Sequence, residues 1–168
     1  VLVSLTVDKT SVDVSESEQT VTFTVDYTDE TGLSSDSWIS LTNENTGTNK
    51  FPMLSGSSPI TTSASFNSSE ASGNWTIYSV RLKDSIGNIK WYYRSELDAL
   101  GVPASIEVVG GETDFDPPVL VSLTVDKTSV DVSESEQTVT FTLEYTDETG
   151  LRSSVDSWIT LTNENTGT

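Results

Sequence analysis

Residues 1–32 read VLVSLTVDKTSVDVSESEQTVTFTVDYTDETG, and almost the same string returns at residues 119–150. Only two positions differ, where Leu143 and Glu144 replace Val25 and Asp26. The second copy then gains two residues and rejoins the first as DSWITLTNENTGT, against DSWISLTNENTGT. The offset of the two strings is 118 residues. A period of this length is too long for a solenoid repeat and suits one whole sandwich domain per repeat.

Within the repeat, apolar and polar residues alternate in short runs. Val21, Phe23, Val25 and Tyr27, for example, are separated by Thr or Asp. A period of two gives a strand one buried and one solvated face. The residues that this pattern predicts to face inward are Val3, Leu5, Val7, Val21, Phe23, Val25, Tyr27, Ile39, Leu41, Tyr78, Val80, Leu82, Ile89, Trp91, Tyr93, Ile106 and Val108. Seven or so short strands in about 115 residues predict an all-β fold, an immunoglobulin-like antiparallel β-sandwich repeated in tandem.

One short segment has helical signals. In Ser95–Gly101, Ser95 can cap the first turn, an acidic residue follows three positions later, and Gly101 can end the helix. We expect this turn to plug one end of the sandwich with Leu97 and Leu100.

The boundary between the copies is marked by Gly110-Gly111 and by the double proline at Pro117-Pro118. Consecutive prolines stiffen a linker and cannot enter a central strand. This favours a complete repeat over residues 1–116 and the first part of the next repeat over residues 117–168. The other frame, residues 51–168 as a permuted or split domain with residues 1–50 pairing elsewhere, stays open. A half repeat with an exposed sheet edge needs a partner, so we expect contacts with neighbouring repeats of the chain or with a second chain.

Composition narrows the classes of function. The formal net charge is −18, from 26 Asp and Glu against 8 Lys and Arg. Such a surface repels nucleic acids and anionic membranes and attracts hard cations, although acidity also simply keeps a protein soluble. The chain has no Cys and no His, which excludes disulfides, thiolate catalysis and zinc fingers and removes the commonest general base. No apolar run reaches membrane-spanning length, so we expect no direct membrane insertion. No signal peptide is visible, and export signals for a secreted product are expected elsewhere in a longer chain.

Two stretches carry a family resemblance. They are DPPVLVSLTVD at residues 116–126 and GNWTIYSVRLKDSIGN at residues 73–88. Together they resemble the immunoglobulin-like tandem repeats of very large bacterial surface proteins, including the extender regions of RTX-type adhesins. The resemblance implies an extracellular spacer on the bacterial cell surface that holds a distal binding domain away from the cell. It also implies calcium at the junctions between domains, where the ion stiffens the array.

Acidic loops are the candidate metal site. The loops after residues 21–27 and 75–83 should meet at the pole where the chain enters the sandwich, and the linker should bring its carboxylates to the same pole of the next domain. Calcium prefers carboxylate, carbonyl and water oxygens. The candidate ligands are Asp29, Glu30, Asp84, Asn88, Glu112, Asp114, Asp116, Asp147 and Glu148. Solvated acidic loops are the alternative, and residues 84–88 also suit a tight hairpin turn.

Aromatic residues offer a second candidate. Trp91, Tyr92 and Tyr93 could form a platform for carbohydrate or another surface polymer, which makes a ligand-binding module the alternative function. The competing interpretation places Trp91 and Tyr93 in the core and Tyr92 over an edge. Trp38 and Trp158 are out of phase with their strands, so they cover an edge or a domain contact, or a bulge turns them inward. We expect no enzymatic activity, because copying an active site along an array adds little and no phosphate loop or nucleophile elbow is present.

Overall fold

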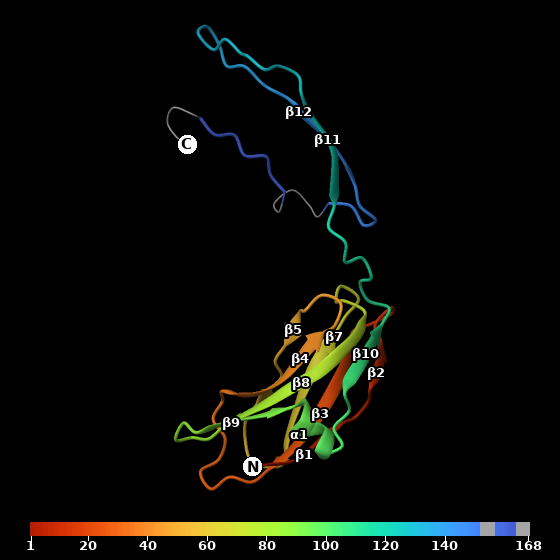
Figure 1. The fold of residues 1–168 in the computed structure, drawn as a ribbon, viewed down its shortest axis with the longest axis vertical. Coiled ribbons are helices and arrows are strands. Elements are labelled where there is room, and N and C mark those ends of the chain that lie inside the picture. The colour runs from red at the N-terminus through yellow and green to blue at the C-terminus, as the bar shows by residue number, and fades with distance from the viewer. Residues whose placement is uncertain (152–156, 164–168) are drawn as a thin grey trace. The chain divides into compact units, whose positions relative to one another are not determined.

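The computed structural model describes residues 1–151 and 157–163, and the chain divides into two compact units, Val1–Phe115 and Asp116–Thr168 (Figure 1). The elements of the first unit are β1 (Leu2–Val7), β2 (Ser11–Asp13), β3 (Gln19–Tyr27), β4 (Ser37–Asn43), β5 (Asn49–Lys50), β6 (Met53–Leu54), β7 (Ile60–Phe66), β8 (Gly73–Lys83), β9 (Ile89–Tyr93), α1 (Arg94–Ala99) and β10 (Ser105–Val109). The second unit contains β11 (Val119–Val125) and β12 (Phe141–Thr146).

The first unit is a two-layer β-sandwich, which confirms the predicted all-β fold class. One sheet has the order β1-β3-β7, and the other has the order β2-β10-β8-β4-β5, with β6 on β4 and β9 on β8. Within residues 1–115, all of which are described, every strand pair is antiparallel except β2 with β10. The inner faces of the two sheets enclose one core. Its largest members are Trp75, Phe23 and Phe66, and the Phe66 and Trp75 rings meet edge to face at 5.3 Å.

The chain enters and leaves this unit at opposite poles. β1 begins beside the end of β3, and Val1 lines a recess together with Asp84, the residue that follows β8. β10 ends beside the start of β8, where Val108 pairs with Gly73. We call the first end the entry pole and the second the exit pole. Figure 1 shows the N-terminus at the entry pole and the chain leaving after β10 at the exit pole.

Two of the predicted inward residues face outward because a bulge shifts the strand phase. The pairing of β1 with β3 shifts between Leu2 and Ser4, so Leu2 and Leu5 are buried and Val3 is 51% exposed. The pairing of β4 with β8 shifts between Ser40 and Leu41, opposite Tyr78, and Tyr78 is 58% exposed. An extra residue on one strand reverses the alternation on that side, which a strict period of two cannot anticipate.

The predicted orientation of β9 is wrong. Tyr92 is buried and its hydroxyl accepts the Leu2 amide at 2.8 Å, whereas Trp91 and Tyr93 lie on the outer face. The reason is the register, because Tyr92 stands opposite the buried Val80. A run of three aromatic residues places apolar side chains on both faces of the strand. The run therefore does not indicate which face is buried.

The predicted helical turn is α1, with two corrections. The N-cap is Tyr93 rather than Ser95, and the backbone amide of Tyr93 donates to the Glu96 carboxylate at 3.3 Å. Leu97 is fully buried, but Leu100 is 39% exposed. Gly101 ends the helix with a φ of 73°, as predicted.

The second unit repeats only part of this architecture. β11 and β12 form an antiparallel pair. In residues 129–131 and 157–163, which correspond to β2 and β4, the structure has no strand.

Candidate functional site

Four of the predicted metal ligands line one recess at the entry pole. The recess has a volume of about 430 Å³. It is lined by Val1, Thr28, Asp29, Glu30, Thr31, Asp84, Ile86 and Asn88. Asp29 and Glu30 come from the loop after β3, whereas Asp84 and Asn88 come from the turn between β8 and β9. The two loops share the pole because β3 and β8 both end there.

The Asp84 carboxylate is bonded within its own turn. Its Oδ1 accepts the backbone amides of Ile86 at 3.1 Å and Asn88 at 2.7 Å, and its Oδ2 accepts the Asn88 side-chain amide at 2.7 Å. Partial desolvation acts to raise the pKa of Asp84, but hydrogen bonds from Asn88, Gly87 and Ile86 outweigh it and lower the pKa below its ordinary value. These contacts match the interpretation of residues 84–88 as a tight turn.

Asp29 is also bonded locally, because its Oδ1 accepts the Thr31 amide at 3.0 Å and the Thr31 hydroxyl at 2.9 Å. Calcium takes about six to eight oxygen ligands. Among residues 1–151 and 157–163, no three Asp or Glu side chains are grouped closely enough to hold a metal ion. These carboxylates alone do not supply that number of oxygens, so a calcium ion in the recess would need further oxygen ligands.

Glu112 and Asp114 lie after β10, at the exit pole of the first unit. The Glu112 amide donates to the Glu70 carbonyl at 2.8 Å, and Glu112 Oε1 accepts the amides of the next two residues at 2.9 Å each. The start of the linker is thus fastened to the loop between β7 and β8.

Asp116, Asp147 and Glu148 belong to the second unit. Asp147 and Glu148 directly follow β12, and Asp116 lies three residues before β11, so all three are at the same end of the β11–β12 pair. Asp147 Oδ1 accepts the Thr149 amide at 3.2 Å, which repeats the Asp29 turn. The grouping of linker carboxylates with these residues at one junction stays a prediction.

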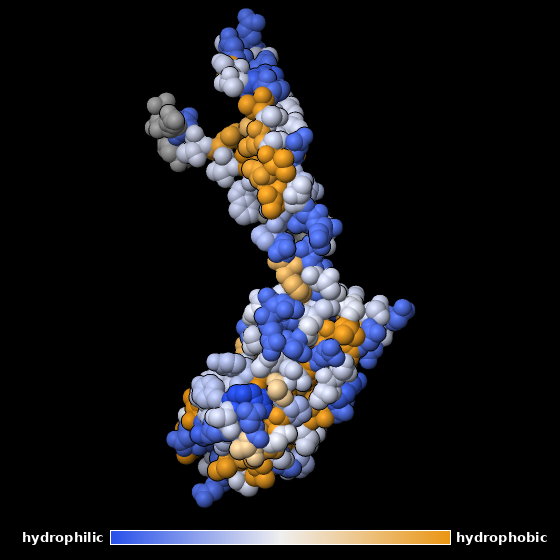
Figure 2. Space-filling model, turned by 45° about the vertical axis from the view of Figure 1, so that its right-hand side comes forward, coloured by the Kyte–Doolittle hydropathy of each residue, from blue (hydrophilic) through white to orange (hydrophobic). Residues whose placement is uncertain are grey.

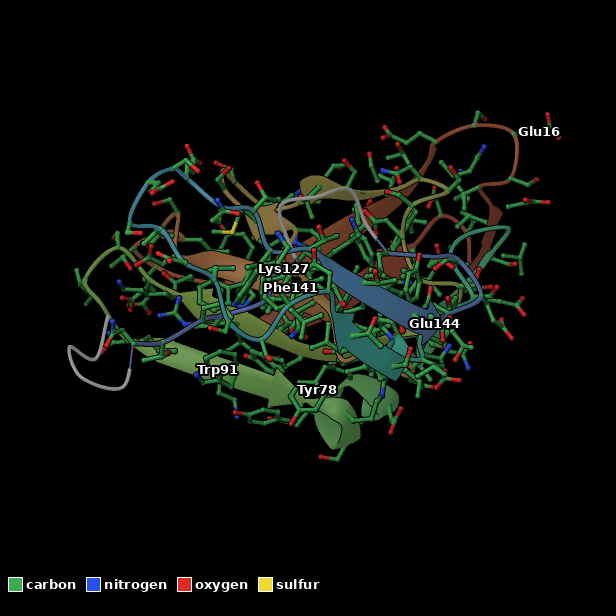
Figure 3. All side chains as sticks on the ribbon, turned by 90° about the horizontal axis from the view of Figure 1, so that it is seen from above. Glu16, Tyr78, Trp91, Lys127, Phe141 and Glu144 are labelled. Carbon is green, nitrogen blue, oxygen red and sulfur yellow. The ribbon has the colours of Figure 1, made fainter. Side chains whose placement is uncertain are left out.

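A row of aromatic side chains lies on the outer face of the β8 sheet, and we call it the aromatic strip. Of the platform that the sequence offered, Trp91 and Tyr93 belong to this strip and Tyr92 is buried. The strip consists of Phe51, Trp38, Trp91, Tyr93 and Tyr78, and the ring centroids of successive members are 6.1, 5.9, 6.1 and 6.3 Å apart. Phe51, Tyr78 and Tyr93 are about half exposed, with exposed fractions of 51%, 58% and 49%. In Figure 3 the labelled Tyr78 and Trp91 lie along the same side of the first unit. Contiguous exposed apolar surface of this kind is typical of interaction sites.

Arg81 organises the strip. Its guanidinium carbon lies 4.4 Å from the Trp38 ring centroid and 5.7 Å from that of Trp91, and its side chain donates to the Asp36 carbonyl. A cation over two rings holds them in fixed orientations. The sequence did contain a signal for this arrangement. A hairpin turn at residues 84–88 pairs Arg81 with Trp91, and cross-strand partners share a face, so an outward Arg81 implies an outward Trp91.

A second feature missed by sequence reasoning is the ion pair of Lys50 and Glu70. The Lys50 ammonium lies 2.5 Å from Glu70 Oε1, and both side chains are mostly buried, with exposed fractions of 23% and 21%. The ammonium also stands 5.1 Å from the Phe66 ring centroid and 5.7 Å from that of Trp75. The pair thus covers the Phe66 and Trp75 rings of the core near the exit pole.

Comparisons of the chain with protein-family models, curated proteins and solved structures found no match. In the part of the chain that the structure describes, no helix has the length and apolar character needed to cross a membrane.

Proposed function

We propose that the chain belongs to the extender of a giant bacterial cell-surface adhesin and holds a distal binding domain away from the cell. The observation that carries this proposal is the combination of a repeated sandwich with entry and exit at opposite poles. A unit whose chain enters at one end and leaves at the other adds its full length to an array each time it is copied. β8 alone has 11 residues, and at about 3.3 Å per residue it spans about 36 Å.

The test is the length of arrays that contain one, two and four copies of residues 1–118. Small-angle X-ray scattering should show the maximum dimension growing linearly, by about 35–45 Å per copy. Arrays that fold back into a globule, with a dimension that grows far more slowly, would contradict the spacer role. Protease treatment of intact cells that express the full protein tests the location, because a surface spacer is cleaved and an internal one is protected.

Calcium at the junctions is a separate part of the proposal. In an array, the linker carboxylates of one repeat would come near the recess of the next repeat, where the two sets would repel one another without a cation. We expect chelation to leave the strands intact while it lowers the Tm or shortens the two-copy array. If a chelator changes neither quantity, the array is stiffened by its linker alone and the calcium part fails.

The aromatic strip favours one alternative function, a module that binds carbohydrate or another surface polymer. The half-exposed rings, which pack beside the two Trp rings that Arg81 contacts, offer flat apolar surface at low entropic cost. Binding of purified polysaccharides should then be lost in Tyr93→Ala and Tyr78→Ala and kept in Phe115→Ala, which removes an exposed ring outside the strip. If none of the polysaccharides binds, or if all three variants bind equally, the strip has no such role.

A further inference from the structure

β7 is the last strand of the sheet β1-β3-β7, so one of its two edges has no neighbouring strand. Each of its seven residues stands opposite one residue of β3 in continuous register. Side chains of a strand alternate between the two faces of the sheet, and the exposed side chains of β7 are those of Thr61, Ser63 and Ser65. β7 is therefore a straight edge strand with one row of side chains in the core and one row in solvent.

Hydrogen bonds on the far side of β3 show which way the backbone of β3 points. The Thr22 carbonyl accepts the Asp8 amide at 3.0 Å, and the Thr22 amide donates to Asp8 Oδ1 at 2.8 Å. Both groups of Thr22 thus point towards the β1 side. Backbone groups of successive residues point to opposite edges of a strand, so Val21 and Phe23 are the residues that bond β7.

The alternation then identifies the unpaired groups of β7. Val21 and Phe23 stand opposite Ala64 and Thr62, which therefore point towards β3. The amides and carbonyls that point outward belong to the residues between and beside them, namely Thr61, Ser63 and Ser65. Among residues 1–151 and 157–163, these outward backbone groups have no hydrogen-bond partner.

The other strands at sheet edges of the first unit carry features that discourage further pairing. β1 has a register shift, β2 has three residues, β5 and β6 have two each, and β9 carries Lys90. Proteins use bulges, short strands and charges to protect sheet edges. β7 has none of these, and it contains no proline.

The neighbourhood of β7 in the sequence is also uncharged. Residues 51–69 contain no Asp, Glu, Lys or Arg, although 20% of the residues in the chain are charged. Figure 2 shows strongly hydrophilic residues in several places over the first unit. An edge that is regular, unpaired and uncharged is a template to which a further strand can be added.

The sequence of β7 fits a second copy of itself. When two copies lie antiparallel and are centred on Ser63, Thr61 stands opposite Ser65 of the other copy, and Ser63 stands opposite its own counterpart. These are the residues whose amides and carbonyls point outward. Opposed residues of this kind exchange two hydrogen bonds in an antiparallel ladder, so the pairing satisfies the outward groups of all three residues in both copies.

The side chains are compatible with the same pairing. Exposed hydroxyl groups meet exposed hydroxyl groups, and Ser and Thr form hydrogen bonds across neighbouring strands. This contact already exists within the chain, because Thr20 Oγ1 and Ser65 Oγ lie 3.3 Å apart between β3 and β7. The net charge of −18 makes two copies repel one another at most surfaces, whereas at β7 no like charges are opposed. A basic partner, in contrast, gains nothing from an uncharged edge.

We propose that β7 is a self-association edge, through which two copies of the chain join their β1-β3-β7 sheets into one continuous sheet. The two copies run in opposite directions, and a two-fold axis passes through Ser63. Such an interface uses the same edge of both copies and is closed. It is small, so we expect weak association. This inference goes beyond the spacer role and does not depend on it.

The test is the oligomeric state of the full chain. Analytical ultracentrifugation at chain concentrations up to about 1 mM, in about 0.15 M salt, should show a reversible equilibrium between monomer and dimer. Ser63→Lys should raise the dissociation constant by about fivefold or more, because two Lys side chains then meet at the axis. The matched control is Thr6→Lys, which adds the same charge at an exposed position of β1 on the other edge of the sheet and should leave the constant unchanged.

A mixture of two variants tests the position of the axis. Ser63→Lys and Ser63→Glu should each dimerise poorly alone, because each opposes like charges. Mixed together they oppose Lys and Glu, so we expect a heterodimer at least as stable as the unmodified dimer.

Amide exchange followed by NMR tests the pairing without any substitution. As the concentration of the unmodified chain rises, exchange at Thr61, Ser63 and Ser65 should slow, whereas exchange at Thr62 and Ala64, which already bond β3, should not change. This result decides the question even if a variant disturbs the fold. A chain that stays monomeric at about 1 mM overturns the proposal. A dimer that leaves these three amides unprotected, or that Ser63→Lys does not weaken, forms through another surface and overturns it as well.

Discussion

The two copies of the repeated stretch, residues 1–32 and 119–150, differ at only two positions. The apolar face of the first copy is buried in the core of the first unit, whereas the apolar face of the second copy is exposed. The strand pair β1–β3 forms again as β11–β12, in the same register. Both strands of that pair lie within the repeated stretch, so the pairing needs nothing from outside it. Burial does need residues from outside that stretch, because in the first unit the strands β7 and β8, which belong to residues 49–115, pair with β3 and β4 and enclose the core; we call residues 49–115 the covering segment.

A second contrast concerns two stretches of almost the same sequence, one that has strand partners and one that has none among the described residues. β4 reads SWISLTN, and residues 157–163 read SWITLTN. The first is a strand that pairs with β5, β6 and β8, whereas the second is not a strand. The sequence of a central strand is therefore not enough to make it extended. It becomes a strand where neighbouring strands are present to form its hydrogen bonds.

The largest expected effect comes from one substitution made in both copies. Leu41 is fully buried, and its counterpart Leu161 is 69% exposed. Leu41→Ala should lower the free energy of unfolding of the first unit by about 2–5 kcal/mol, whereas Leu161→Ala should change it by less than about 0.5 kcal/mol. Urea unfolding followed by tryptophan fluorescence measures both. Equal costs at the two positions would mean that the second copy buries Leu161 as the first buries Leu41.

A smaller effect is expected at the Lys50–Glu70 pair, which belongs to the covering segment. Lys50→Met leaves the mostly buried Glu70 carboxylate without its cation, and we expect a loss of about 2 kcal/mol in the first unit. Amide exchange in β11–β12 should not change. As a control, Lys90→Met removes an ion pair that is about half exposed and should cost less than about 1 kcal/mol. A similar cost for both variants would show that burial does not strengthen the Lys50 pair.

The next prediction again uses matched positions. The Tyr27 hydroxyl donates to the Gly56 carbonyl at 2.9 Å, and Gly56 belongs to the covering segment. Tyr27→Phe should cost about 1 kcal/mol because it removes this hydrogen bond, whereas Tyr145→Phe should have no measurable effect. Thermal unfolding of the two variants decides between them. A loss at Tyr145 as large as that at Tyr27 would contradict the contrast between the copies.

The smallest effects concern carboxyl titration. Hydrogen bonds from the backbone and side chain of Ser15 lower the pKa of Asp13 below 3.8, and Ser133 lowers the pKa of Asp131 in the same way. Both contacts are local, so NMR titration should give similar midpoints in the two copies. Because these folded pKa values are depressed, their contribution to stability is present above the unfolded pKa and is lost as the pH falls through the folded value.

Asp36 provides the non-local comparison. A hydrogen bond from Lys83, supported by the charge of that residue, lowers the pKa of Asp36. Lys83→Met should return the Asp36 titration toward 3.8, while Asp13 titrates as before. A shift at Asp13 would show that the substitution disturbs the fold rather than the pair.

Period-two patterns predicted the fold class and most of the inward residues, including Phe23, Ile39 and Val80. They failed at Val3 and Tyr78, where a bulge reverses the phase. β7 was not predicted because its sequence, ITTSASF, has few apolar residues, and its position in the sheet depends on the edge that β3 offers. Bulges and edges are properties of paired strands, so a single strand's sequence does not contain them.

The candidate site was predicted in part. The loops that carry Asp29 and Asp84 were expected at one pole, and they line one recess. The hydrogen bonds of the Asp29 carboxylate to Thr31 were not expected. Those of the Asp84 carboxylate within its own turn were allowed for only by the hairpin interpretation of residues 84–88. The aromatic strip was foreseen only as a possible platform at Trp91 and Tyr93. The strand pattern placed both residues inward because it did not use the cross-strand partner Arg81 of Trp91.

The parallel pair of β2 and β10 has a consequence for a chain under tension. A pull on the two ends of the first unit draws β2 toward the entry pole and β10 toward the exit pole. Since the two strands run in the same direction, their hydrogen bonds, together with the flanking bonds of Glu107 to Thr10 at 2.8 Å and Val14 to Val109 at 2.9 Å, carry the load in shear. Bonds loaded in shear must break together, whereas a ladder pulled from one end opens bond by bond, so we expect this unit to resist unfolding when its two ends are pulled apart.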